Sequence, residues 1–435
     1  MQHKIGAIIM KNEYRQRIVD RVLKRKLEGK GAILIEGAKW CGKTSTGEHA
    51  AKSILYMSDP KEVEQNLHLA AVNPEVLLRG ARPRLIDEWQ LAPKLWDAIR
   101  FAADHEGELG LFIMTGSAVP ADMSEVRHSG TGRIGWLRMR PMTLWESGES
   151  SGEVSLSSLF DDDRQISGIS NIDLQLLSYV TCRGGWPLAC TMKKKDVALD
   201  QAFDYVKAVQ QRDLSASDGV ERDPERVKVL LRSLARNQGS QAPVNTIRQD
   251  MVTNDTQTLD EDTVASYIKA LKRIFVEEDV SAWNPNLRSK TAIRTGDTRY
   301  FVDPSIATAS LGLGPDDLVN DLNTFGLIFE TLCLRDLRVY AEAIDGEVFH
   351  YRDKTNLECD AVVHLRNGKY GLIEIKLGGE KLIEEGVKTL NKLEQRIDTD
   401  KMKSPSFKMV LTGVGKYAYR REDGILIVPI GCLKD

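Results

Sequence analysis

The stretch that decides the fold is Ala32-Ile33-Leu34-Ile35-Glu36-Gly37-Ala38-Lys39-Trp40-Cys41-Gly42-Lys43-Thr44. Its apolar beginning predicts a buried strand, and the residues from Ser45 onward predict a helix. The loop between them has the spacing G-x4-G-K-T of a P-loop. In such a loop, glycines let backbone N–H groups close around phosphate oxygens, and the helix N-terminus adds positive potential. A chance match is the alternative, and the strand–loop–helix context argues against it.

The P-loop motif predicts ATP and Mg²⁺ as ligands, and it assigns a role to each motif residue. Gly37 and Gly42 allow the backbone to approach the phosphates. Lys43 is expected to reach the β- and γ-phosphates, and the Thr44 hydroxyl is expected to bind Mg²⁺.

A second apolar run, Leu85-Ile86, ends in Asp87 and Glu88. Asp87 is expected to hold Mg²⁺, directly or through water, and Glu88 to polarise the attacking water. Acidic pairs are common at strand ends, so this pair has a structural alternative. Its place behind a P-loop favours the functional interpretation.

A third apolar run, residues 109–114, leads into Thr115-Gly116-Ser117. The Ser117 hydroxyl is a candidate sensor of the γ-phosphate, and an ordinary polar turn is the alternative. Arg133 follows in a glycine-rich loop and is a candidate catalytic arginine, acting on its own site or on that of a neighbouring copy. A surface arginine is the alternative there. Strands that alternate with helices in this way indicate a parallel α/β sheet.

The middle of the chain predicts helices. Residues 151–170 are polar and predict a flexible crossing, followed by helices over about 171–215. Three helices over 225–280, then β-like pieces near 280–283 and 299–302, suggest a winged helix-turn-helix. DNA contact and protein docking are both open for this segment, since Glu277, Glu278 and Asp279 lie beside its basic residues. Those basic residues are Lys269, Lys272 and Arg273 in a candidate recognition helix and Arg288, Lys290, Arg294 and Arg299 in a candidate wing.

From residue 316 onward, a long helix precedes several strands. Glu330 lies in that helix, Asp360 in the strand near 359–365, and Glu374 and Lys376 in the strand near 370–377. Two carboxylates could bind Mg²⁺, which activates a water molecule, while the lysine stabilises charge. A two-residue turn at Asn367-Gly368 would pair Asp360 with Ile375 and turn Glu374 to the other face. The metal site therefore requires a three-residue loop or a bulge.

Composition sets broad limits. The 435 residues carry a net charge of -3 and are 42% hydrophobic, which suggests two to four domains. The basic segment 11–30 is expected to be a solvated helix, with a nucleic-acid patch as the alternative. The six cysteines have no zinc-site spacing and suit a reducing cytoplasm. No run approaches the roughly 18 apolar residues of a membrane span, so we expect a soluble cytoplasmic protein without a membrane partner.

The order P-loop, LIDEWQ, LFIMTGSA, HSGTGRI and RPMTLWESGE resembles the bacterial and archaeal AAA-type ATPases whose C-terminal half is the DUF4143 family. Later landmarks of this resemblance include CRGGWPLA, RYFVDPSIA and YRDKTNLECDAVV. It implies ATP binding through Gly37, Gly42, Lys43, Thr44, Asp87 and Glu88. The pattern of Glu330, Asp360 and Glu374-x-Lys376 is similar to that of the PD-(D/E)xK nuclease superfamily.

The expected architecture is α/β, with an AAA-type P-loop sheet, a helical and winged-helix region, and a mixed, restriction-endonuclease-like C-terminal domain. The expected domains are the ATPase core (1–150), a helical lid or linker (151–222), a winged-helix-like domain (223–315) and the nuclease-like domain (316–435). The expected function is ATP hydrolysis coupled to action on or near nucleic acid, with homo-oligomers possible. The alternative is an ATP-gated regulatory or scaffold switch with an inert C-terminal domain.

Overall fold

The computed structural model describes residues 14–118, 129–161, 166–252, 259–284, 296–400 and 402–435. Its first part is a five-stranded parallel sheet with strand order β2-β3-β4-β1-β5. The predicted parallel α/β sheet is therefore confirmed. The strands are β1 (Ala32–Glu36), β2 (Ser53–Tyr56), β3 (Arg84–Asp87), β4 (Phe112–Gly116) and β5 (Ile134–Arg138).

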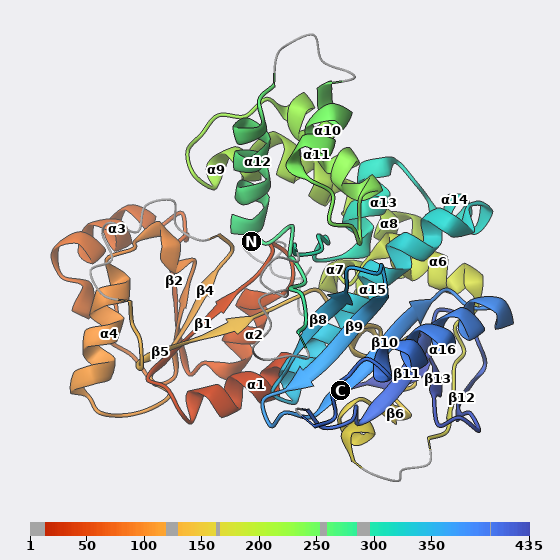
Figure 1. Cartoon of the computed structure of the whole chain (residues 1–435). Helices are drawn as coiled ribbons and strands as arrows, with labels where there is room; N and C mark the ends of the chain where they lie inside the picture. The colour runs from red at the N-terminus through yellow and green to blue at the C-terminus, as the bar shows by residue number, and fades with distance from the viewer. Residues whose placement is uncertain (1–13, 119–128, 162–165, 253–258, 285–295, 401) are drawn as a thin grey trace.

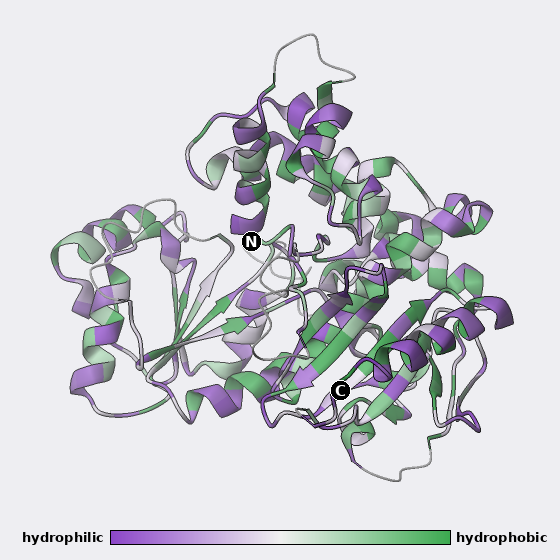
Figure 2. Ribbon diagram, in the orientation of Figure 1, coloured by the Kyte–Doolittle hydropathy of each residue, from purple (hydrophilic) through white to green (hydrophobic). Residues whose placement is uncertain are grey.

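Helices cover both faces of this sheet (Figure 1). β1 and β4 are central and almost wholly apolar, as expected for strands of a parallel sheet that is buried on both faces. The strands of this sheet and of the large C-terminal sheet are mostly green in Figure 2, where green marks hydrophobic residues. The helices of this part are α1 (Ile18–Leu27), α2 (Lys43–Ala50), α3 (Val63–Val72), α4 (Leu95–His105) and α5 (Leu144–Ser147).

The middle of the chain is helical. A π-helical segment, η4 (Val209–Asp213), interrupts the run between α8 and α9. Three helices, α10 to α12, are followed by single antiparallel bridges that link Glu277 with Phe301 and Val280 with Thr298. The helices are α6 (Leu174–Arg183), α7 (Pro187–Thr191), α8 (Lys195–Ala208), α9 (Leu214–Ala216), α10 (Pro224–Arg236), α11 (Val244–Val252), α12 (Glu261–Arg273), α13 (Pro304–Leu311) and α14 (Pro315–Asn320).

The C-terminal part is a seven-stranded mixed sheet with strand order β7-β12-β13-β11-β10-β9-β8. The long helix α15 (Leu322–Ala343) packs on one face, and α16 (Glu380–Glu394) packs on the other (Figure 1). The main strands are β8 (Gly346–Arg352), β9 (Glu358–Leu365), β10 (Tyr370–Lys376), β11 (Phe407–Thr412), β12 (Tyr417–Arg420) and β13 (Leu426–Pro429). This arrangement agrees with the predicted mixed α/β domain.

The expected flexible crossing at 151–170 is wrong for its described residues, because two short strands there join the C-terminal part. β6 (Val154–Ser155) pairs with β14 (Leu433–Lys434), and β7 (Gly168–Ile169) pairs with β12. One buried apolar cluster also runs through the middle helices, α15 and one face of the mixed sheet. Among the described residues, no helix is long and apolar enough to cross a membrane.

Candidate nucleotide site and C-terminal carboxylate cluster

The P-loop lies between β1 and α2, as the sequence predicts. Gly42 precedes α2 with φ +104°, a conformation that favours glycine. At Gly37 a side chain would place its Cβ 2.0 Å from the Met139 carbonyl oxygen, so only glycine fits. Lys43 Nζ donates hydrogen bonds to the carbonyl oxygens of Gly37 (2.9 Å) and Ala38 (2.8 Å). The ammonium is thus held at the mouth of the loop, where phosphate oxygens would accept the same hydrogen bonds.

Asp87 lies against the P-loop helix. Thr44 Oγ1 donates to Asp87 Oδ1 at 2.8 Å, and Thr115 Oγ1 donates to the same atom at 2.6 Å. These contacts exist because β4 lies between β1 and β3, so the ends of all three strands meet at one edge of the sheet. A carboxylate beside a threonine hydroxyl is an oxygen ligand set that suits Mg²⁺.

Glu88 directly follows β3 in a left-handed conformation, with φ +57°. Such a backbone is unusual for a residue other than glycine and is often found at functional sites. Its Oε2 atom accepts hydrogen bonds from Ser117 Oγ (3.3 Å) and from Gln90 Nε2. The structure thus brings the predicted residues Glu88 and Ser117 together, and it adds Gln90, which sequence reasoning missed.

A cavity of about 1350 Å³ opens over the P-loop. Its far wall comes from the middle helices and includes Trp186, Leu188 and Tyr205. Trp186 stacks on Tyr205 with a centroid distance of 4.2 Å, and the P-loop residue Trp40 meets Tyr205 edge-on at 5.6 Å. Sequence reasoning used Trp186 and Pro187 only as part of the landmark CRGGWPLA. The nearby Gly-Trp-Pro pattern could not reveal that this turn faces the P-loop.

Arg133 lies far from the phosphate end of its own P-loop. It immediately precedes β5, whose first residue pairs with Ala32 at the start of β1, whereas the P-loop follows the end of β1. Five residues of strand at about 3.3 Å each separate the two edges by on the order of 15 Å. Arg133 forms an ion pair with Asp104 and is half exposed. The alternative that Arg133 acts on its own site is therefore wrong, and action on a neighbouring copy stays a prediction.

Arg17 was expected on a solvated helix face, and that expectation is wrong. It is 5% exposed. Its guanidinium donates to the Cys41 carbonyl oxygen of the P-loop (3.0 Å), to the Arg140 carbonyl oxygen (3.0 Å) and to Glu146 Oε1 (2.8 Å). The spacing of charged residues within one segment carries no information about partners elsewhere in the chain, so the sequence could not predict that Arg17 is buried.

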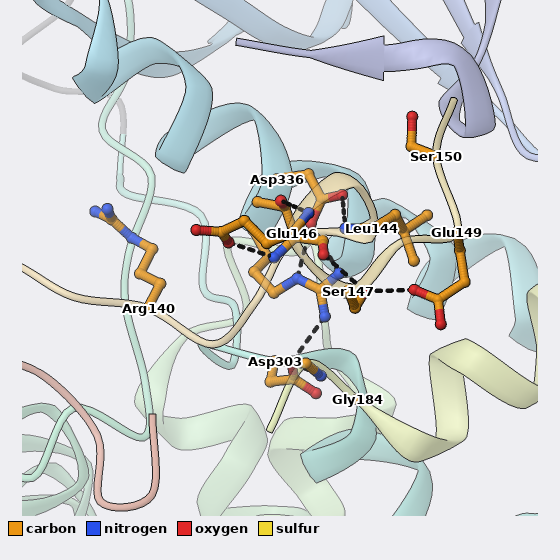
Figure 3. Close-up of polar contacts among 12 residues, drawn as sticks. Arg140, Leu144, Glu146, Ser147, Glu149, Ser150, Gly184, Asp303 and Asp336 are labelled. Atoms are coloured by element: carbon orange, nitrogen blue, oxygen red, sulfur yellow. Dashed lines mark hydrogen bonds and ion pairs between the residues drawn. The ribbon is translucent and has the colours of Figure 1, made fainter. Parts of the chain in front are cut away.

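Glu146 and its neighbours connect the ATPase part with α15 (Figure 3). The Leu144 N–H donates to Asp336 Oδ2 at 2.9 Å. Arg335, beside it in α15, binds Asp336 Oδ1 (2.8 Å) and Asp303 Oδ2 (2.9 Å). All three charged side chains are fully buried. Breaking one such buried pair typically costs about 3–5 kcal/mol, so this connection is strongly held.

The four predicted residues of the C-terminal cluster lie together. β9 and β10 pair in the register Leu372 with Val362 and Ile373 with Ala361, which places Asp360 opposite Glu374. The loop between the strands has three residues, 366–368, closed by the Leu365 N–H donating to the Lys369 carbonyl oxygen at 2.8 Å. This is the longer loop that the metal-site hypothesis requires.

Lys376 neutralises this cluster. Its Nζ lies 3.1 Å from Asp360 Oδ2 and 2.8 Å from Glu374 Oε2. Burial, followed by the charge of Asp360, raises the pKa of the Glu330 and Glu374 carboxyls. Burial opposes the charged form of Lys376, but the Asp360 and Glu374 carboxylates together raise its pKa. Within the described ranges, no group of three or more His, Cys, Asp or Glu side chains is arranged to hold a metal ion. The lysine thus provides the positive charge that the carboxylates need.

The middle segment covers the cluster. The Tyr300 hydroxyl donates a hydrogen bond to Glu330 Oε1. Gly239 lies against the same carboxylate, because a Cβ there would be 3.4 Å from both of its oxygens. Tyr300 is a contact that sequence reasoning missed, since it lies 30 residues before Glu330.

The candidate DNA-contacting residues are partly engaged within the protein. Lys269 is exposed on α12, whereas Lys272 pairs with Asp279, and Arg299 lies 3.7 Å from Glu277. The first turn of α12 carries Glu261 and Asp262. The predicted wing residues Arg288, Lys290 and Arg294 lie outside the described residues.

Three family models match the chain in succession. An AAA domain matches residues 29–147, the domain of unknown function DUF8612 matches 174–317, and the domain of unknown function DUF4143 matches 325–433. An uncharacterized protein of Mycobacterium tuberculosis, Rv2008c, is 23% identical over 357 residues, which are 81% of this chain and 72% of that protein. The uncharacterized protein Mb2031c of Mycobacterium bovis matches equally well.

Two solved structures resemble the chain distantly. The Walker-type ATPase PABY2304 of Pyrococcus abyssi aligns over 67% of this chain and 94% of its own, with 14% identity and a TM-score of 0.40. The Orc1 protein of Aeropyrum pernix in complex with DNA aligns over 71% and 94%, with 12% identity and a TM-score of 0.26. The chain thus carries an AAA-type P-loop domain followed by a C-terminal DUF4143 domain.

Proposed function

We propose that the protein hydrolyses ATP with Mg²⁺ at the P-loop site and that this activity controls the middle and C-terminal parts of the chain. The observation that carries this proposal is the convergence of Lys43, Thr44, Asp87 and Glu88 at one edge of the parallel sheet. Each of these side chains has a defined task at that edge. Lys43 binds the β- and γ-phosphates, Thr44 and Asp87 hold Mg²⁺, and Glu88 takes a proton from the attacking water. Mg²⁺, when bound, neutralises charge that develops on the phosphates.

The control of the rest of the chain is supported by the buried polar chain through Arg17. Arg17 touches the P-loop at Cys41 and also binds Glu146. The neighbouring Leu144 is bound to Asp336 of α15, the helix that also carries Glu330. A shift of the P-loop on nucleotide binding would therefore be passed to the C-terminal cluster through rigid contacts.

The partner class is nucleic acid in the first hypothesis and a protein in the alternative, an ATP-gated switch. Lys269 and the winged-helix order of α10 to α12 support DNA, and the acidic start of α12 supports a protein dock. The discriminating measurement is the ATPase rate with and without DNA. Stimulation by DNA supports the first hypothesis, and an unchanged rate supports the switch.

The proposed domains are 1–150, 151–222, 223–315 and 316–435. The DUF8612 match at residues 174–317 covers most of the second, all of the third and the first two residues of the fourth. All six cysteines are free thiols, which suits our proposal of a cytoplasmic location.

We predict that Arg133 completes the ATP site of a neighbouring copy, which makes the active form a homo-oligomer. Its half-exposed side chain and its place away from its own P-loop support this role. Glu88→Gln and Arg133→Ala proteins should each be nearly inactive, because each lacks one part of every site. A mixture should regain activity, since the Glu88→Gln copy lends its Arg133 to the intact Glu88 of its neighbour.

Arg100→Ala is the matched control for this mixing experiment, since Arg100 binds the same Asp104 carboxylate at 2.7 Å. It should retain ATPase activity. A strictly monomeric protein on light scattering, with no rescue in the mixture, would contradict the prediction.

A second candidate function is metal-dependent phosphodiester cleavage by the C-terminal cluster. The observation that favours it is the pairing of Asp360 opposite Glu374, with Lys376 and Glu330 beside them. Asp360 and Glu374 would hold Mg²⁺ or Mn²⁺, while Lys376 and Glu330 would orient the nucleophile. The neutralising position of Lys376 in this structure equally suits the alternative, an inert domain.

We predict that Mn²⁺ raises the melting temperature of the nucleotide-free full-length protein and that Asp360→Asn reduces this shift. Binding to the folded state at 100 times Kd stabilises by about 2.7 kcal/mol. Asp345→Asn is the control, because Asp345 is an exposed carboxylate of the same domain that pairs with Arg25. Identical Mn²⁺ responses of wild type and Asp360→Asn would leave the inert domain as the better description.

A further inference from the structure

Two buried oxygen atoms on one face of the C-terminal sheet have no hydrogen-bond partner among the described residues: Glu374 Oε1 and Thr412 Oγ1. The Glu374 side chain is 4% exposed, and Thr412 is 1% exposed. Leaving a buried polar atom unpaired is unfavourable, so native proteins satisfy almost all of them, by protein groups, water or a bound ion. These two atoms therefore indicate a place where a bound group belongs.

The two residues that carry these oxygens share one face of the sheet. β10 and β11 are parallel neighbours, and Thr412 is the register partner of Lys376, while Glu374 pairs with Val410. Side chains of register partners project from the same face, and so do those of residues two apart. Glu374, Lys376 and Thr412 thus face the same side of the sheet.

One glycine borders the Thr412 oxygen, and another borders the base of the Glu374 side chain. A Cβ at Gly415 would lie 3.5 Å from Thr412 Oγ1, and a Cβ at Gly386 of α16 would lie 3.2 Å from Glu374 Cβ. A side chain at Gly415 or Gly386 would crowd Thr412 or Glu374. Because both positions are glycine, there is space beside these two residues.

We propose that Thr412 supplies a hydroxyl ligand to a divalent cation, Mg²⁺ or Mn²⁺, that is bound by Glu374. A carboxylate oxygen and a hydroxyl oxygen are hard ligands of the kind that these ions prefer. The cation takes over the charge compensation that Lys376 now gives to Glu374 and Asp360. This inference rests on the second candidate function and adds a residue that the acidic pattern in the sequence does not include.

The test is Mn²⁺ binding to the full-length protein, measured by electron paramagnetic resonance of free Mn²⁺ without nucleotide. All proteins carry Asp87→Asn, so that the P-loop site does not contribute. Thr412→Val should weaken Mn²⁺ binding by about tenfold, the scale on which supporting ligands act. Thr412→Ser, which keeps the hydroxyl, should bind as the parent does.

Thr308→Val is the matched control, because Thr308 is equally buried but its hydroxyl donates to the Ser305 carbonyl oxygen at 3.1 Å. It should leave Mn²⁺ affinity unchanged and lower the melting temperature of the metal-free protein. Thr412→Val should not lower that temperature, since the hydroxyl it removes has no partner.

The outcomes distinguish the role of Thr412 from the second candidate function. If the parent binds Mn²⁺ and Thr412→Val binds it equally well, the inference is wrong and the second candidate function stands. If the parent binds no Mn²⁺, both are wrong. Should Thr412→Val fail to fold, Thr412→Ala carries the same test.

Discussion

Replacing Glu88 with glutamine is expected to slow ATP hydrolysis at least about a hundredfold while ATP binding stays intact. Glutamine keeps the size of the side chain and its hydrogen bonds with Ser117 and Gln90, but it cannot take a proton from water. Because the binding contacts come from Lys43 and the P-loop backbone, the affinity for ATP should not change. Single-turnover hydrolysis and equilibrium binding of a fluorescent ATP analogue measure the two effects separately.

Glu48→Gln is the matched control for this experiment. Glu48 also lines the cavity over the P-loop, and its Oε1 accepts a hydrogen bond from Tyr56 at 2.7 Å. The Glu48→Gln substitution removes a negative charge from the cavity but should change the hydrolysis rate little. A Glu88→Gln protein that turns over at the wild-type rate would show that Glu88 is only an acid at a strand end.

Local motifs made it predictable that the residues of the candidate nucleotide site lie together. The P-loop, Asp87-Glu88 and Thr115-Gly116-Ser117 each follow a short apolar run, and a parallel sheet brings the carboxyl ends of its strands to one edge. Each run carries its own signal within a few residues, so no long-range information is needed. The sequence could also predict the order of helix and strands in the C-terminal domain, where a long helix, α15, precedes β8 and β9.

The register of the C-terminal hairpin was not predictable. Asn367-Gly368 fits a two-residue turn, and it also fits a three-residue loop that ends with glycine in a left-handed conformation. The structure has the second form, with Gly368 at φ +83°. One residue of difference decides whether Asp360 and Glu374 share a face, and the dipeptide is the same in both cases.

Long-range contacts account for the other misses. Arg17 directly precedes α1, within a basic segment that predicts a solvated helix. It is buried because Glu146 lies 129 positions away in sequence and next to it in space. The strands β6 and β7 are too short to show a periodic pattern. They form by pairing with β14 and β12, which lie more than 200 positions away in sequence. The wall of the cavity likewise requires that the middle helices fold back over the P-loop.

Replacing Lys43 with alanine is expected to abolish tight ATP binding. Lys43 Nζ lies at the mouth of the P-loop, where it donates to the carbonyl oxygens of Gly37 and Ala38, and its residue is 5% exposed. Because solvent screens this buried ammonium group only weakly, it should interact strongly with the β- and γ-phosphates. Loss of one partner of a buried charged hydrogen bond costs about 2–5 kcal/mol, which raises Kd by roughly 30-fold to several thousandfold.

Lys39→Ala gives the matched control, because Lys39 belongs to the same loop and lines the same cavity but points its ammonium to Asp213, 2.6 Å away. It is half exposed, so solvent screens its charge and its loss should change ATP affinity little. Equilibrium binding of a fluorescent ATP analogue to the wild type and both variants provides the measurement, with circular dichroism to show that each is folded. If Lys43→Ala and wild type bound ATP with equal affinity, residues 37–44 would not be the phosphate-binding loop. The assignment of the nucleotide site would then be wrong.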